Sequence, residues 1–430
     1  FGEANRYGIF PSFSLGWKIS DEPFMSGLDW LTNLKLRAGW GQTGNQEIGN
    51  YRHYSQLGLV GWVSGQNLLL NSGIAPLEYP NRGLRWESTE MTNVGVDAGF
   101  FRNQLTMVVE YYHRGTDGML LEQPLPGSAG YRRDPVRNVG EITNQGIEAV
   151  LTYKKAIGNF NYSLQLNGAY NKNEVKSLGG SFALPGASQS DAAMGFLTRT
   201  QEGYPMGSFY GWVTDGIFQS EEEVAVAPYQ TPETAPGDIK FKDLDGDYQI
   251  TGEDRTFIGS PWPDFTYGFS ANLGYKNLSV SIFLQGVYGN EIYFMDRTFY
   301  ESLSGSMNQS LNVLEDHYWT PENPSQTMPR AIAGNPNANN RFSDRFVEDG
   351  SFLRIKNVVL SYDLPVNTLE RLRLKGLQIY IKGNNLLTFT RFSGLDPEIG
   401  ELRNNSLNAG IAIGQYPVSR IFTAGLNISL

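Results

Sequence analysis

Three aspartates alternate with other residues in the segment DLDGDYQITGED, which spans positions 243–254. Asp243, Asp245 and Asp247 stand at relative positions 1, 3 and 5, where a tight loop turns alternate side chains inward onto one hard cation. The backbone carbonyl of Gln249 would follow at position 7, and Asp254 stands at position 12, where an EF-hand has a bidentate Glu. The segment therefore predicts a Ca²⁺ ion with a structural role, holding its loop together.

Two features of this segment depart from an EF-hand. Gly246 stands at position 4 and Tyr248 at position 6, whereas an EF-hand has its glycine at position 6. The flanks do not look helical, and the residues before the segment, 239–241, resemble a strand. A solvated acidic turn without a metal is the alternative interpretation.

Four aromatic residues are candidates for substrate contact, because they lie in or beside long loops. They could stack on a sugar ring or pack on a partner, and packing within the loops is the alternative. They are Trp62, Tyr210, Trp212 and Trp262. No nucleophile elbow, phosphate-binding loop or zinc signature occurs, so we expect no catalytic and no cofactor-binding residues and a protein that is not an enzyme.

The composition excludes several other classes of protein. The 430 residues carry a formal net charge of -10 and no cysteine, which excludes a disulfide scaffold and argues against a nucleic-acid partner. Aromatic residues make up 13% of the chain, too much apolar surface for a disordered protein.

The elements that must position these residues are strands, because the dominant hydrophobic period is two. The clearest example is the run from Phe265 to Tyr275, in which aromatic or aliphatic residues alternate with Thr, Gly, Ser and Asn. A change of phase between Ile355 and Val358 predicts a β-bulge. We expect strands at about 12–20, 33–42, 92–100, 105–113, 146–154, 160–172, 265–275, 278–288, 352–362, 377–387 and 418–430.

The connections between these strands alternate between short and long. The long ones span 43–91, 114–145, 173–264, 289–351 and 388–417. Outer-membrane barrels have this asymmetry, with short periplasmic turns and long extracellular loops. The strands approach membrane-spanning length, and their second face is small and polar, as expected for a wet lumen. A soluble β-sandwich or propeller is the alternative, since its strands also alternate.

The expected strand number is odd, whereas single-chain bacterial barrels have even counts. The chain also starts at Phe1 rather than Met. We therefore expect about 11 strands of a larger transmembrane antiparallel barrel; eleven more would give the 22 of outer-membrane transporters with a plugged lumen.

Several longer stretches resemble the C-terminal half of SusC/RagA-type TonB-dependent transporters of Bacteroidetes. They occur in the family's order over nearly the whole chain, and their combination is more specific than any one of them. They are RYGIFPSFSLGWKIS (6–20), LKLRAGWGQTGNQEIGNY (34–51), LRWESTEMTNVGVDAGFF (84–101), GSFYGWVTDGIFQS (207–220), GDIKFKDLDGDYQITGEDRTFIGSPWPDFTYGF (237–269), FLQGVYGNEIY (283–293), DRFVEDGSFLRIKNVVLSY (344–362), GNNLLTFTRFSGLDPEIG (383–400) and YPVSRIFTAGLNISL (416–430).

The resemblance implies more than the pattern does. It implies a 22-stranded barrel with an N-terminal plug, location in the bacterial outer membrane, and a SusD-like surface lipoprotein that closes over the barrel. It also implies import of oligosaccharides or peptides, driven by the TonB–ExbB–ExbD complex. The Asp243–Asp247 stretch coincides with a D-x-[DN]-G-D motif common in the family.

Two departures from the family limit what carries over. The plug, the TonB box and the first half of the barrel are absent, and the chain ends in Leu430 where the family often has an aromatic residue. We therefore expect residues 1–430 to be the C-terminal part of the barrel, with 173–264 as a long extracellular loop region.

Two other functional classes stay open at this point. A secreted carbohydrate-binding or glycan-degrading β-protein would also use aromatic loops, and a hydrolase would need two facing carboxylates that sequence does not reveal. A passive pore or adhesin would share the barrel without the energy coupling.

Overall fold

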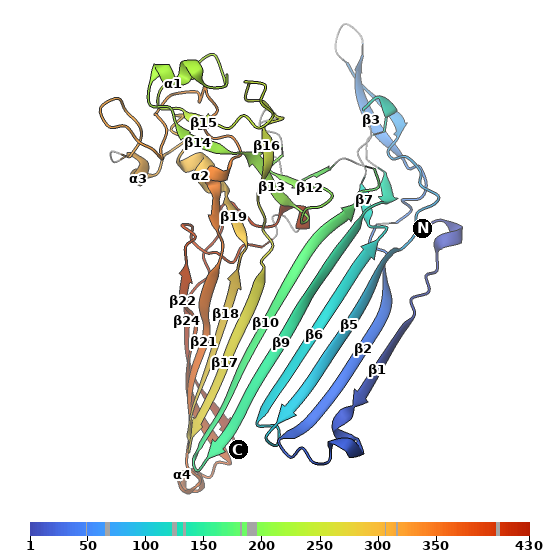
Figure 1. Ribbon diagram of the computed structural model, residues 1–430, viewed down its shortest axis with the longest axis vertical. Coiled ribbons are helices and arrows are strands. Elements are labelled where there is room, and N and C mark those ends of the chain that lie inside the picture. Colours follow the sequence, from blue (N-terminus) through green and yellow to red (C-terminus); the bar gives the residue numbers. More distant parts are fainter. Residues whose placement is uncertain are drawn as a thin grey trace. The chain divides into compact units, whose positions relative to one another are not determined.

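The computed structural model describes residues 1–48, 50–64, 69–122, 127–131, 135–180, 183–186, 196–305, 307–314, 317–400 and 405–430. Within these ranges, eleven strands form one antiparallel sheet, in which each strand pairs with the next long strand along the chain (Figure 1). The strands are β1 (Ser12–Lys18), β2 (Leu31–Asn45), β5 (Glu87–Phe100), β6 (Leu105–Asp117), β9 (Glu141–Ile157), β10 (Phe160–Ser177), β17 (Phe265–Tyr275), β18 (Leu278–Tyr288), β21 (Phe352–Asp363), β22 (Gly376–Thr390) and β24 (Ile421–Ser429).

Each strand predicted from the alternation is present, and an all-β fold is confirmed. Several strands are longer than predicted, most clearly β9, which begins at Glu141 instead of about 146, and β10, which continues to Ser177. Their extra residues are mostly polar, and the apolar Ile142 and Val175 among them are isolated, so the apolar alternation stops while the backbone pairing continues. Hydrophobic alternation marks only the part of a strand that has an apolar face.

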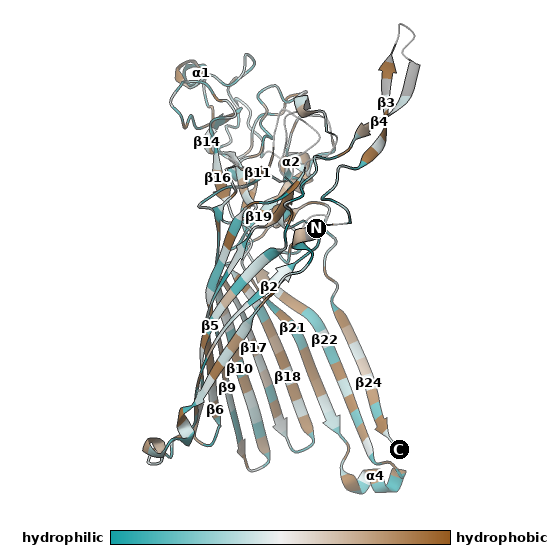
Figure 2. Cartoon of the chain, turned by 90° about the vertical axis from the view of Figure 1, so that its right-hand side faces the viewer, coloured by the Kyte–Doolittle hydropathy of each residue, from teal (hydrophilic) through white to brown (hydrophobic). Residues whose placement is uncertain are grey.

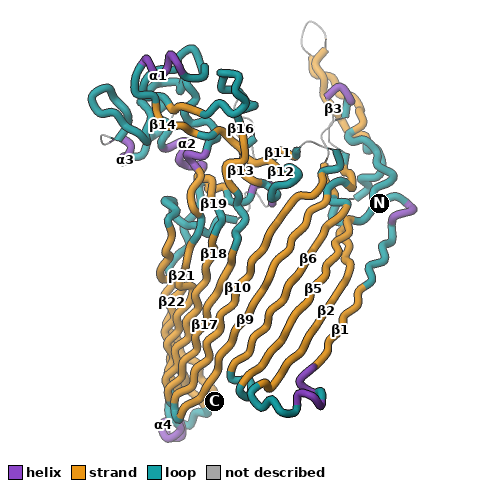
Figure 3. Tube along the Cα trace, viewed as in Figure 1, coloured by secondary structure: helices purple, strands orange, loops and turns teal. Residues whose placement is uncertain are grey.

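The chain divides into two compact units. One contains Phe1–Leu151, Asn171–Ala183 and Gln201–Tyr204, and the other contains Thr152–Tyr170, Leu184–Thr200 and Pro205–Leu430. In each unit, the long strands are joined at one end by short connections (Figure 3). In the second unit these are residues 276–277 between β17 and β18 and the short helix α4 (Val366–Leu372) between β21 and β22. The predicted alternation of short and long connections is confirmed.

One face of the long strands is apolar and open to solvent. Leu15 on β1, Ile381 on β22 and Phe422 on β24 are 73%, 55% and 77% exposed. Figure 2 shows apolar positions recurring along β18, β22 and β24. Leaving such side chains in water forgoes about 1.5–3 kcal/mol each. This surface is therefore suited to lipid and not to water.

The opposite face of the same strands is polar and hydrogen-bonded from strand to strand. Ser281 donates to Asn272 across β17 and β18 at 2.7 Å, and the hydroxyls of Ser279 and Ser361 lie 2.7 Å apart across β18 and β21. Asn357 donates to Asn384 at 2.7 Å across β21 and β22. These small polar residues fit a water-lined surface.

The predicted bulge lies at Lys356. On β21, Ile355 pairs with Leu284 and Asn357 pairs with Phe283, so Lys356 has no partner on β18. This extra residue places Ile355 and Val358 on one face, although three positions separate them. The bulge explains the change of phase in the sequence.

The remaining described elements lie in the connections. The strands there are β3 (Leu57–Ser64), β4 (Leu69–Pro76), β7 (Leu120–Glu122), β8 (Val136–Asn138), β11 (Leu184–Pro185), β12 (Thr198–Thr200), β13 (Ser208–Trp212), β14 (Thr214–Ile217), β15 (Ile239–Phe241), β16 (Arg255–Gly259), β19 (Glu291–Phe294), β20 (Val347–Asp349) and β23 (Ile411–Ala412). The α-helices are α1 (Glu221–Val226), α2 (Met295–Tyr300) and α3 (Leu311–Leu314), and the 3-10 turns are η1 (Glu3–Asn5), η2 (Ile19–Asp21), η3 (Pro23–Met25), η4 (Gly127–Ala129), η6 (Asp344–Phe346) and η8 (Ser406–Asn408). Among the described residues, no helix combines the length and the apolar character needed to cross a membrane.

Candidate functional site

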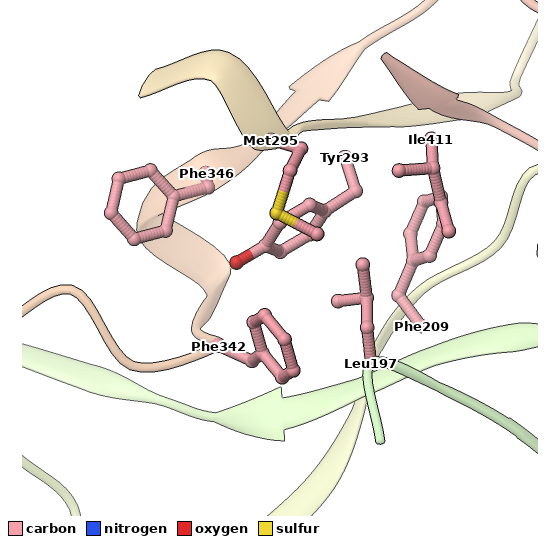
Figure 4. Close-up of a cluster of buried hydrophobic side chains, with 7 residues drawn as sticks. All are labelled: Leu197, Phe209, Tyr293, Met295, Phe342, Phe346 and Ile411. Atoms are coloured by element: carbon pink, nitrogen blue, oxygen red, sulfur yellow. The ribbon is translucent and has the colours of Figure 1, made fainter. Parts of the chain in front are cut away.

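Three of the long connections share one hydrophobic core in the second unit (Figure 4). The ring of Tyr293 lies at its centre, with centroids 5.9 Å from Phe209 and 6.1 Å from Phe342. The core side chains are Leu197 and Phe209 from the first connection, Tyr293, Met295, Phe342 and Phe346 from the second, and Ile411 from the third. These loops are therefore a packed assembly, which we call the loop core, that holds its surface residues in place.

A second apolar cluster lies next to the acidic segment. Trp212 and Ile217 from β13 and β14 pack with Ile250, which follows the three aspartates at position 8 of the segment. The other members are Ile239, Phe241 and Trp319. Burial of Ile250 fixes the end of the acidic loop to this second apolar cluster.

The structure brings the first three predicted ligands together. The carboxylate oxygens of Asp243, Asp245 and Asp247 lie within 4.8 Å of one another on the exposed side of the loop. Each carboxylate also accepts backbone N–H groups, with Asp243 accepting from Gly246 at 2.7 Å and Tyr248 at 2.8 Å. Three oxygens at this spacing can ligate one cation of the size of Ca²⁺, whose ligands lie about 2.3–2.6 Å away.

Asp254 lies beneath this group and closes the loop. Its carboxylate is fully buried and accepts the backbone N–H of Leu244 at 2.8 Å and that of Thr251 at 2.6 Å. It therefore joins the two ends of the loop directly, and it is outside the group of three clustered carboxylates. Gln249 donates its backbone N–H to Asp247 at 2.7 Å.

The backbone turn that an EF-hand makes at its glycine occurs here at Tyr248. Tyr248, at position 6, has φ +64°, and Gly246 has φ +81°. A left-handed conformation is unfavourable for a bulky residue, so Tyr248 is held there by the surrounding hydrogen bonds. The departure from the EF-hand sequence is thus accommodated without a change in the turn.

The three carboxylates differ in acidity. Desolvation acts to raise the pKa of Asp243, but the N–H donors of Gly246 and Tyr248 outweigh it and lower that pKa. The N–H of Asp247 acts to lower the pKa of Asp245, but desolvation and the charges of Asp247, Asp254 and Asp243 together raise it. The ionised form of Asp245 is therefore disfavoured by its acidic neighbours, and a bound cation would remove this repulsion.

The predicted substrate aromatics fall into different environments. Trp212 is 7% exposed, belongs to the second apolar cluster and donates its indole N–H to the Thr251 carbonyl at 2.7 Å. Trp262 is half-buried and donates to the Met206 carbonyl at 2.6 Å. Trp62 pairs with Asn71 in the β3–β4 hairpin, and its side chain lies outside the described part of the structure. Only Tyr210 presents a partly open ring together with charged neighbours.

Sequence reasoning missed the charged residues that attach the last loop to the sheet. Arg354 on β21 is 2% exposed and donates to Asp396 at 2.6 Å and to Glu398 at 2.7 Å. Lys356, the bulge residue, also contacts Glu398 at 2.9 Å. A charged residue at Arg354 inside an apolar strand was the available signal, but its partners lie about 40 positions away.

The chain matches the family model described as "TonB dependent receptor-like, beta-barrel" over residues 2–386. TonB-dependent receptor P3 of Formosa agariphila is 33% identical over 438 residues, covering 100% of this chain and 42% of that relative. TonB-dependent receptor SusC of Bacteroides thetaiotaomicron is 29% identical over 448 residues, covering 100% of this chain and 40% of that relative. The chain thus spans less than half the length of these relatives.

The fold also matches a solved structure over its whole length. The structure described as the RagAB peptide transporter superposes with a TM-score of 0.80 at 28% identity, covering 100% of this chain and 44% of that one. The same importer in its "open-open" state gives a TM-score of 0.80 at 27% identity.

Proposed function

Since this chain belongs to the β-barrel part of the TonB-dependent receptor family, an outer-membrane family of transporters and receptors rather than enzymes, we propose that it serves active import of nutrients as the C-terminal barrel half of a SusC-like channel. The imported molecules are oligosaccharides or oligopeptides. We expect an N-terminal plug and the rest of the barrel in a full-length protein, since this chain covers 42% of the relative's length.

The observation that carries this proposal is the two-faced sheet. Its apolar face is exposed, as lipid contact requires, and its polar face is linked by serine and asparagine hydrogen bonds, as a wet lumen requires. A secreted carbohydrate-binding or glycan-degrading protein, the other candidate, would instead bury the apolar face inside its own body.

Two partners follow from the same proposal. The relative RagAB is described as a peptide importer with "closed-closed" and "open-open" states. We expect a SusD-like surface lipoprotein to close over the loop core, and TonB–ExbB–ExbD to supply energy through the N-terminal part. A loop core with buried aromatic residues is a firm surface on which such a lid can rest.

Substrate contact would come from the exposed side of the loops. Tyr210 and Trp262 keep part of their rings open, and Trp62 lies on a separate hairpin. The buried Trp212 would act indirectly, by holding β13 in position.

A Ca²⁺ ion bound by Asp243, Asp245 and Asp247 would have a structural role in this importer. The convergence of three carboxylates and the raised pKa of Asp245 support it. The ion would keep the acidic loop folded on the surface that faces the lid, and Asp254 would hold that loop from below.

The test of import uses the full-length protein with its lipoprotein partner. Deletion of the gene should abolish uptake of a fluorescent oligosaccharide or oligopeptide, and the full-length gene should restore it. Uptake should also stop when a protonophore dissipates the proton gradient, whereas a passive pore would continue. Recovery of the full-length protein in the aqueous fraction, without detergent, would contradict the proposal.

A further inference from the structure

Two arginines in the loop core share one aromatic ring. The guanidinium carbon of Arg199 lies 4.6 Å from the Tyr210 ring centroid, and that of Arg255 lies 4.8 Å from it. Arg199 comes from β12 and Arg255 from β16, the strands on either side of β13, which carries Tyr210 (Figure 1). The sheet therefore holds both guanidinium groups against one ring, each within 4.8 Å of its centroid.

Neither arginine has an acidic partner among the described residues. Arg297, Arg330, Arg345 and Arg354 each form an ion pair with a carboxylate, as expected in a chain with a net charge of -10. Among the described residues, Arg255 donates to the backbone carbonyls of Phe196 and Tyr210 and to no side chain. The side chain of Arg199 makes no hydrogen bond within the described part of the chain, and its Nε and that of Arg255 are buried without an acceptor.

This arrangement is electrostatically costly as it stands. Burial lowers the pKa of Arg255, and the charge of Arg199 lowers it further. The Tyr210 ring offsets only part of that cost, because a cation over an aromatic face gains about 0.5–2 kcal/mol. A partly buried pair of like charges is stable when an anion joins it.

We propose that Arg199, Arg255 and Tyr210 form a binding site for a carboxylate group carried by the imported oligomer. This inference rests on the proposed import function and narrows its substrate class to anionic oligomers. Both arginines are only partly buried, so their terminal nitrogens can reach a ligand at the surface. Guanidinium groups suit a carboxylate because they donate two parallel hydrogen bonds to it.

The carboxylate has two sources, a uronic acid in a glycan or an acidic residue in a peptide. The first experiment uses an arginine-selective dicarbonyl reagent, phenylglyoxal, on the purified full-length protein in detergent, with modified peptides measured by mass spectrometry. Arg199 should react, whereas the ion-paired Arg354 should not. A galacturonic acid hexamer or a glutamate-rich pentapeptide should slow the modification of Arg199 at least fivefold, and the methyl-esterified hexamer or amidated peptide should not.

Each result has a defined meaning. Protection by one acidic probe supports the site and identifies the source of the carboxylate. Lack of reaction at Arg199, no protection by either acid, or equal protection by the neutral probes would overturn the site. Because the assay needs no transport, protection without uptake would refute import alone, and uptake without protection would refute the carboxylate site alone.

Variants provide a second readout on the same probe. Arg199→Gln should weaken binding of the protecting acid at least tenfold and leave the fold intact, since the substitution keeps the backbone pairing of β12 and the side chain of Arg199 makes no hydrogen bond among the described residues. Arg371→Gln is the matched control, because Arg371 is an exposed arginine on α4. Equal binding by Arg199→Gln and the control would contradict the proposal.

Discussion

The carboxylate of Asp396 accepts a hydrogen bond of 2.6 Å from Arg354, although Asp396 lies in the loop after β22 and Arg354 on β21. Both side chains are almost fully buried. Asp396 also accepts a hydrogen bond of 2.9 Å from the backbone N–H of Glu398. The Glu398 carboxylate in turn accepts a hydrogen bond of 2.7 Å from Arg354. This pair therefore attaches the 391–400 loop to the wall of the sheet.

Replacing Asp396 by Asn should release that attachment. The variant leaves buried Arg354 with Glu398 as its remaining partner at 2.7 Å, so the loss of stability should be smaller than the about 3–5 kcal/mol expected for a buried charge without any partner. Urea unfolding of the full-length protein in detergent should show this loss, and proteolysis within 391–400 should become faster. Lys356→Gln is the control, since a half-exposed pair contributes at most about 1 kcal/mol. Equal stability of the two variants would contradict the anchoring role.

Removing calcium should loosen the acidic loop. EDTA leaves Asp243, Asp245 and Asp247 repelling one another, so proteolysis of 173–264 should accelerate, and added Ca²⁺ should reverse the effect. Asp245→Asn should abolish the Ca²⁺ response and, without the ion, leave the loop more resistant than in the wild type because one repulsive charge is gone. Glu253→Gln controls for loss of a nearby charge. An unchanged proteolysis rate after chelation would contradict the proposed calcium site.

Calcium protection should weaken as the pH falls. Ca²⁺ binds ionised carboxylates, and Asp245, with its raised pKa, takes up a proton before an ordinary aspartate does. Asp243, with its lowered pKa, stays ionised to a lower pH. Because protons and Ca²⁺ compete for these carboxylates, raising the Ca²⁺ concentration should shift the midpoint of this loss of protease resistance to lower pH. A midpoint that does not change with Ca²⁺ concentration would contradict the calcium site.

Truncating Trp212 should test how much the second apolar cluster contributes to the stability of the loops. Trp212→Ala removes a buried ring and its hydrogen bond to Thr251, for a loss of about 3–5 kcal/mol. Trp262→Ala should cost less because that ring is half-buried. Protease resistance of the loops in the full-length protein measures both. A loss of substrate binding in Trp212→Ala with unchanged loop resistance would instead indicate direct substrate contact.

The eleven long strands could be predicted because each carries an apolar residue at every second position. The run from Phe265 to Tyr275 shows the period, and even the bulge at Lys356 was visible as a change of phase. The loop core could not be predicted, because Phe209, Tyr293 and Ile411 meet across some 200 positions and no local period links them.

The acidic site was predicted in part for a similar reason. The convergence of Asp243, Asp245 and Asp247 follows from local spacing, and the structure shows it. The cluster in which Trp212 packs on Ile250 and Trp319 joins residues far apart in the chain, so the sequence does not encode it locally. The Arg199–Arg255 pair depends on strand order in the same way.

The unpaired residue at Lys356 also restricts how the length of β21 can change. Successive side chains of a strand point to opposite faces of the sheet. Gaining or losing one residue in the regularly paired part of β21 would therefore exchange the lipid-facing and lumen-facing positions on one side of the change. Ile355 and Val358, which lie three positions apart, point to the same face only because Lys356 between them is unpaired. Deletion of Lys356 should therefore leave Ile355 and Val358 on the same face and permit assembly, whereas deletion of a single residue from the regularly paired part of β21 should abolish it.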